Sequence, residues 1–164
     1  MSLQSPAGRI ATLGPVGHIR PAPGTWGSLA AIPLAFALHQ LGGIVALAAA
    51  SLVITALGVW AIRRATGAGT DHDPSEIVID EVAGQWIALW PVSLGAELSG
   101  APIFALWPGI LAAFVLFRLF DILKPGPVGW ADRMQSPLGV MLDDVIAGAF
   151  AALGVAALAA IAHL

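Results

Sequence analysis

The sequence predicts an all-α, polytopic membrane protein, a bundle of about five transmembrane helices that forms a single domain over residues 1–164. Composition is the first reason: 58% of the residues are hydrophobic and 10% are charged, whereas a soluble domain is about 25% charged. Secondly, four apolar stretches are long enough to cross, or nearly cross, a bilayer, which takes about 17–25 residues. Thirdly, these stretches are rich in Ala and Leu and lack the alternation of β-strands.

The apolar stretches give the expected helices in order. The four long stretches are residues 43–62, 82–96, 101–117 and 145–162, and a shorter fifth stretch is residues 26–39. The short stretch either crosses the membrane or forms a re-entrant or interfacial piece. The helix that includes Val82 needs residues before it to complete its span. Pro and Gly interrupt residues 1–25, so we expect an irregular N-terminal segment and no signal peptide.

Charged residues predict the orientation of the bundle. If the five helices alternate in direction, all Lys and Arg residues fall on the side of the N-terminus, with every acid except Glu97. The opposite side holds the C-terminus, and its loops and tail carry only Glu97 and His163. Because cytoplasmic loops are enriched in Lys and Arg, we expect the charged side to face the cytoplasm and the C-terminus to lie outside.

Several classes of site and partner are excluded by composition. The chain has no cysteine, which excludes disulfides, thiolate metal sites and a cysteine nucleophile. The net charge is -3, and no basic tract indicates a nucleic-acid partner. Small residues in the apolar stretches permit close helix packing, including a homodimer.

The first polar motif precedes the shortest apolar stretch. Residues 14–28 are rich in Gly and Pro, and Thr25 is the expected N-cap of the helix that follows. Gly24 would allow close backbone approach, and Ser28 adds a hydroxyl. Free N–H groups at such a helix start suit a phosphate, although spacing alone favours an ordinary helix entry loop lying on the membrane.

The second motif places five carboxylates within residues 71–81. The last two, Asp80 and Glu81, directly precede apolar helix. Acids at a helix N-terminus are stabilised by the macrodipole, but an adjacent pair at membrane depth indicates a functional site. His72, in the same stretch, is either a general acid or base or only a loop histidine.

Two further motifs lie at the ends of the later apolar stretches. Arg118 and Asp121 are three residues apart on one helix face, and Lys124-Pro125 should end that helix. A salt bridge is the default interpretation, but Arg118 and Lys124 can also hold phosphate oxygens. Asp143 and Asp144 precede another apolar helix, where N-capping explains only one of them.

These acids should converge at one membrane surface. Like charges near lipid oppose folding unless a cation neutralises them, and hard oxygen ligands without cysteine favour Mg²⁺ over zinc. A cation beside basic residues and a glycine-rich helix start suits phosphoryl chemistry. The expected metal ligands are Asp80, Glu81, Asp121, Asp143 and Asp144.

Four motifs, in residues 21–28, 77–81, 117–125 and 139–148, resemble those of the phosphatidylglycerophosphatase A family and occur in the family's order. The resemblance covers roughly residues 14–150. It implies a Mg²⁺-dependent phosphatase of the bacterial inner membrane that converts phosphatidylglycerophosphate to phosphatidylglycerol and phosphate, the last step of phosphatidylglycerol synthesis. The phospholipid would enter the site from the membrane, at the cytoplasmic face.

Two departures from the family pattern are visible. Ser136-Pro137-Leu138 stands where relatives often carry Gly-Gly, which predicts a stiffer loop. Arg20, which follows His18, either contacts the lipid headgroup or faces anionic lipid.

The resulting hypothesis is metal-assisted hydrolysis of a phosphomonoester, with Arg118 and Lys124 on the phosphate and Thr25 and Ser28 completing its cradle. His72 or a carboxylate would transfer the proton, and attack by a carboxylate in place of water stays open. The alternative is a cation transporter or channel, which would place charges at mid-bilayer and polar groups at both membrane faces.

Overall fold

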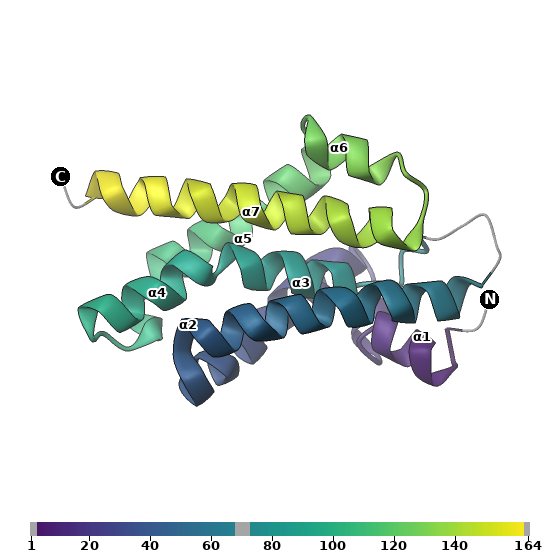
Figure 1. The fold of residues 1–164 in the computed structure, drawn as a ribbon, viewed down its shortest axis with the longest axis horizontal. Helices are drawn as coiled ribbons and strands as arrows, with labels where there is room; N and C mark the ends of the chain where they lie inside the picture. The colour runs from purple at the N-terminus through teal and green to yellow at the C-terminus, as the bar shows by residue number, and fades with distance from the viewer. Residues whose placement is uncertain (1–2, 68–72, 163–164) are drawn as a thin grey trace.

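The computed structural model describes residues 3–67 and 73–162, and these residues contain helices and no strand. Figure 1 shows the longer helices running roughly along the longest axis of the molecule, with α7 extending over most of its length. The elements in chain order are α1 (Pro6–Ala11), η1 (Val16–His18), α2 (Pro23–Thr66), α3 (Ile79–Ala88), α4 (Trp90–Ser99), η2 (Ile103–Leu106), α5 (Trp107–Leu123), α6 (Pro127–Asp132) and α7 (Pro137–Ala162).

Helix α2 is two helices joined at a sharp reversal. Its backbone leaves helical geometry at two successive glycines, and the second, Gly43, has a positive φ of 61°, which favours glycine. A straight helix would separate Gly27 from Gly58 by about 46 Å. Both glycines instead pack on the start of α3, where a Cβ would lie 2.8 Å from Val78 Cβ and 3.5 Å from Ile79 Cγ2, respectively. The break predicted between residues 39 and 43 is therefore confirmed.

Helices α3 and α4 together form one bent rod, the third expected helix. Its start at Ile79 confirms that residues before Val82 extend this helix. The bend follows from Pro91, which lacks an N–H and leaves the carbonyl of the residue four positions earlier without its helical partner.

Among the described residues, three helical segments are long and apolar enough to cross a membrane: α2, residues 103–123 and α7. The first contains the reversal, and each half of the α3–α4 rod has only ten residues. The fold class is thus an all-helical membrane-type bundle, whereas five crossings and the side that faces the cytoplasm stay predictions.

The loops expected on the side of the C-terminus lie at one end of the molecule. In Figure 1 the reversal in α2 and the ends of α4 and α7 lie toward the left, and α1 lies at the right. A hydrogen bond joins two of these connections, because Ile44 N donates to Glu97 Oε1 at 2.7 Å. Glu97 is therefore occupied as a helix cap at this end.

The N-terminal segment is more regular than expected. Ser5 Oγ accepts a hydrogen bond from Gly8 N at 3.0 Å, and Pro6 takes the first position of α1. Ser followed by Pro is a strong helix start, because the hydroxyl satisfies a free N–H and Pro has none to satisfy. The prediction of an irregular segment over residues 1–25 was wrong for α1.

Close packing between α3 and α7 brings the site together. A Cβ on Gly148 would overlap the carbonyl oxygen of Gly84, and a Cβ on Gly84 would lie 2.6 Å from the carbonyl oxygen of Asp144. The two backbones can approach this closely only because both residues are glycine. Phe117 of α5 is fully buried beside Gly84, so three helices meet at this level.

Candidate functional site

Five carboxylates from three helices converge in the interior of the bundle. Asp80 and Glu81 lie in the first turn of α3, Asp121 lies in the last turn of α5, and Asp143 and Asp144 lie in α7. They form two groups whose carboxylate oxygens lie within 4.8 Å of one another, and Asp144 belongs to both. The groups are Asp80, Glu81 and Asp144, and Asp121, Asp143 and Asp144.

The position of Asp143 and Asp144 in their helix corrects a prediction. Helix α7 begins at Pro137, so these acids lie in its second turn and do not open it. Ser136 Oγ accepts a hydrogen bond from Gly139 N at 3.0 Å, and the following Pro occupies the first helical position. The Ser-Pro step predicted to stiffen a loop is therefore the helix start, and capping explains neither aspartate.

Two cations face this cluster. Arg118 Nη1 lies 2.7 Å from Asp121 Oδ2 and 3.9 Å from Glu81 Oε1. Lys124 Nζ donates to Asp143 Oδ2 at 2.9 Å and to Asp132. Burial disfavours the charged ammonium, but these two hydrogen bonds outweigh burial and raise the pKa of Lys124 above its ordinary value. The expected end of the helix before Lys124-Pro125 is confirmed.

Negative charge exceeds positive charge in this cluster. Asp80, Asp143 and Asp144 are 7%, 6% and 3% exposed. Within the described residues, neither Asp80 nor Asp144 forms an ion pair with Lys or Arg. Buried carboxylates without a counter-ion are costly, and a divalent cation held by oxygen ligands would neutralise them. The donor set therefore fits a hard metal ion such as Mg²⁺.

The start of α2 lies against the cluster. A Cβ on Gly24 would overlap the carboxylate of Glu81 and would lie 3.3 Å from Arg118 Nη1, so the glycine makes room for both side chains. Thr25 is not the N-cap, because the helix begins at Pro23 after Ala22. Ser28 is fully buried, and its hydroxyl donates to the Gly24 carbonyl at 2.9 Å, so its proton is already used within the helix.

Sequence reasoning missed two residues and named one that cannot be placed. Asp132 shares Lys124 with Asp143, and only the fold brings it there. Gln85 is fully buried one turn after Glu81, and a single amide within an apolar helix was the available signal. His72 lies outside the described residues. Arg20 pairs with Glu76 at 2.7 Å, so this guanidinium is bound to the loop before α3.

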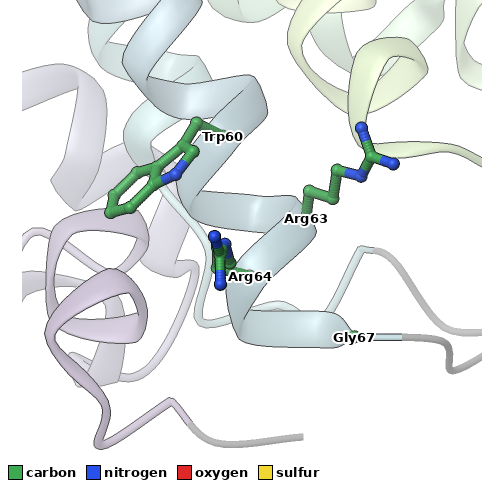
Figure 2. Close-up of a pocket in the computed structure, with 4 residues that line it drawn as sticks. All are labelled: Trp60, Arg63, Arg64 and Gly67. Atoms are coloured by element: carbon green, nitrogen blue, oxygen red, sulfur yellow. The ribbon is translucent and has the colours of Figure 1, made fainter.

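A separate basic hollow lies at the end of α2. It has a volume of about 610 Å³ and is lined by Trp60, Arg63, Arg64 and Gly67 (Figure 2). None of these four residues belongs to the carboxylate groups. This hollow is therefore separate from the carboxylate cluster.

Comparison with known proteins gives consistent matches. Residues 9–159 match the family model described as phosphatidylglycerophosphatase A. A phosphatidylglycerophosphatase A from Haemophilus influenzae is 36% identical over 96% of this chain and 97% of its own length. The phosphatidylglycerophosphatase A of Escherichia coli is 34% identical over 79% of this chain and 70% of its own length. A Bacteroides thetaiotaomicron protein provisionally named phosphatidylinositol-3-phosphatase is 38% identical over 79% of this chain and 78% of its own. No solved structure matches the chain.

Proposed function

The chain belongs to the phosphatidylglycerophosphatase A family, and from this premise we propose that it is a Mg²⁺-dependent lipid phosphatase. Its reaction would be hydrolysis of phosphatidylglycerophosphate to phosphatidylglycerol and phosphate, the last step of phosphatidylglycerol synthesis. We place the protein in the bacterial inner membrane, with the site open to the cytoplasm.

The observation that carries the proposal is the convergence of five carboxylates from three helices with two cations, Arg118 and Lys124. Asp144 belongs to both carboxylate groups, so it is the residue we expect to contact metal in either group. Asp80, Glu81, Asp121 and Asp143 are the further candidate ligands. When bound there, Mg²⁺ would supply Lewis-acid polarisation of a phosphoryl oxygen.

The remaining tasks fall to side chains that already face the cluster. Arg118 and Lys124 would bind equatorial phosphate oxygens, exchanging part of their carboxylate contacts for the substrate. A carboxylate of the cluster that does not hold metal would accept the proton of the attacking water. Gly24 makes room at the start of α2 for the side chains of Glu81 and Arg118, which keeps both groups in the cluster that would face the phosphate.

A transporter fits the arrangement less well. A cation path requires polar groups through the bilayer to its opposite face. At the opposite end of the described structure Glu97 is the acidic residue, and its carboxylate accepts a hydrogen bond from Ile44 N. We therefore retain the phosphatase.

The direct test is phosphate release by the purified protein in detergent. We expect release from phosphatidylglycerophosphate with Mg²⁺ and loss of release with EDTA, restored when Mg²⁺ is returned in excess. Phosphatidic acid is the comparison substrate, and Glu97→Gln, at the far end, is the control variant that keeps activity. No Mg²⁺-dependent release from either lipid would rule out this function.

A further inference from the structure

Gln85 is a buried amide that no described residue satisfies. It has no exposed surface, and neither Oε1 nor Nε2 has a hydrogen-bond partner among the described residues. Buried polar side chains nearly always have a partner in native structures, and an exception requires an explanation. For an amide inside an apolar helix, that explanation is a group absent from the bare polypeptide.

The position of Gln85 connects this amide to the site. It follows Glu81 by four residues on α3, so the two side chains lie on the same helix face. Glu81 Oε2 and Arg118 Nε are also buried without a hydrogen-bond partner. The donor and the acceptor of Gln85 thus belong to a set of buried, unsatisfied polar atoms on α3 and α5, and two residues of this set, Glu81 and Arg118, lie against Gly24.

The chemistry of the amide selects the ligand. A metal ion would use only the carbonyl oxygen, and a phosphate oxygen would use only the N–H group. A hydroxyl group both donates and accepts, so it satisfies both ends. Resting on the proposed function, we propose that Gln85 is a specificity-determining residue that hydrogen-bonds a glycerol hydroxyl of the headgroup.

This contact would distinguish two lipids with the same reacting group. Phosphatidylglycerophosphate carries its phosphomonoester on a glycerol with a free hydroxyl, whereas phosphatidic acid has no headgroup glycerol. A site built to hydrogen-bond a substrate hydroxyl rejects an analogue without it, because its own polar groups are then left unpaired.

The test is the ratio of kcat/KM for the two lipids. Gln85→Met, which keeps the volume and removes both hydrogen bonds, should lower kcat/KM for phosphatidylglycerophosphate by at least about tenfold and change that for phosphatidic acid by less than about twofold. If phosphatidic acid is not hydrolysed, its inhibition constant replaces kcat/KM. Gln40→Met, at an exposed position of α2, is the matched control.

Equal losses on both lipids, or no loss, would overturn the assignment of Gln85. Gln85→Asn, which keeps the amide but shortens it, provides a second variant if Gln85→Met fails to fold in thermal unfolding. If wild-type protein releases phosphate from neither lipid, the proposed function fails first and this inference with it. The two proposals therefore fail in different measurements: the proposed function fails in phosphate release by wild type, and the role of Gln85 fails in the ratio of kcat/KM for the two lipids.

A second, independent observation concerns the basic hollow. Figure 2 shows Trp60 and Arg64 beside the N-terminal segment, while Arg63 extends to the other side of α2, toward α7. On that side a hollow of about 270 Å³ shares Arg63 and Gly67, and Leu138 is part of its wall. Arg63 and Arg64 are exposed and form no ion pair with any described residue.

Two guanidinium groups that pair with no described acid flank the end of an apolar helix, and such an arrangement is complementary to one kind of lipid. Juxtamembrane arginines attract anionic headgroups, and an interfacial Trp packs along the lipid at headgroup level. We infer that this basic hollow binds the headgroup of an anionic phospholipid that is not hydrolysed. None of its described lining residues belongs to the carboxylate groups.

The test measures thermal unfolding in detergent with added phosphatidylserine, an anionic lipid that is not the reaction product, against phosphatidylcholine. Phosphatidylserine should raise the unfolding temperature of wild type, and Arg63→Gln/Arg64→Gln should lose most of that increase. The matched control is Arg9→Gln/Arg133→Gln, which removes the same charge from exposed positions and should keep it. Equal losses in the two double variants would indicate general attraction and overturn the site, as would no loss.

Discussion

Neighbouring acids in this site have different partners because they lie on helices. Successive side chains of an α-helix point about 100° apart. Asp143 therefore reaches Lys124 at 2.9 Å, while Asp144 joins both carboxylate groups. In α3 the same divergence directs Glu81 toward Arg118 and Gly24. An adjacent pair thus serves two parts of one site, which capping would not require.

Asp144→Asn is expected to be the most damaging single change in the cluster. The amide keeps the size of the side chain but removes one negative charge from both groups, so the affinity for Mg²⁺ and kcat should both fall, kcat by at least about a hundredfold. Phosphate release measured across a Mg²⁺ titration checks this.

Asp132→Asn is the matched control for that variant. Among the described residues, Asp132 forms an ion pair with Lys124 alone, and its side chain is 39% exposed, so we expect a loss of less than about fivefold, within the effect of an exposed ion pair. If Asp144→Asn kept wild-type kcat at saturating Mg²⁺, Asp144 would have no place among the ligands.

At the scale of elements, the distance between α3 and α7 decides whether the carboxylates meet. Gly84 and Gly148 let the two backbones touch at this level. Phe117 packs beside them and sets the position of α5. These contacts lie one turn from Asp80 and Asp144, so small shifts of either helix change the site directly.

Gly148→Ala tests that coupling. Its Cβ would overlap the Gly84 carbonyl oxygen, so the helices must separate, and we expect a loss of about 1–3 kcal/mol in unfolding free energy together with lower kcat. Gly95→Ala is the control, because its Cβ would lie at an ordinary 3.5 Å from Leu106 Cδ1. Thermal unfolding and phosphate release report the two effects, and equal results for the two variants would contradict the coupling.

Local sequence patterns correctly predicted where a helix reverses or ends at Gly or Pro. The reversal at Gly43 and the end of α5 before Lys124 follow from Gly and Pro at those positions. The starts of α2 and α7 were misplaced because Pro was treated as a helix breaker, although it is favoured in the first turn. The role of Gln85 could not be predicted, because its missing partners are a property of the packed bundle.

At the scale of the whole molecule, the site and the basic hollow belong to the half that holds the polar loops. The opposite end contains the reversal of α2 and the end of α4, joined through Glu97. Leu41 at this reversal is 82% exposed, whereas Met134, between α6 and α7, is 39% exposed. These two positions therefore report on opposite ends of the bundle.

Cysteine labelling at these two positions tests the orientation. The chain has no native cysteine, so Leu41→Cys and Met134→Cys each introduce a single thiol. The basic residues lie with Met134, and cytoplasmic loops are the ones enriched in Lys and Arg. The cells have a permeabilised outer membrane and a sealed inner membrane. A membrane-impermeant maleimide should then label Leu41→Cys, and it should label Met134→Cys only after the inner membrane is opened. The reverse pattern would place the carboxylates at the periplasmic face. Labelling of both thiols while the inner membrane is sealed would show that the α2 hairpin and the α6–α7 connection lie on the same side of the membrane.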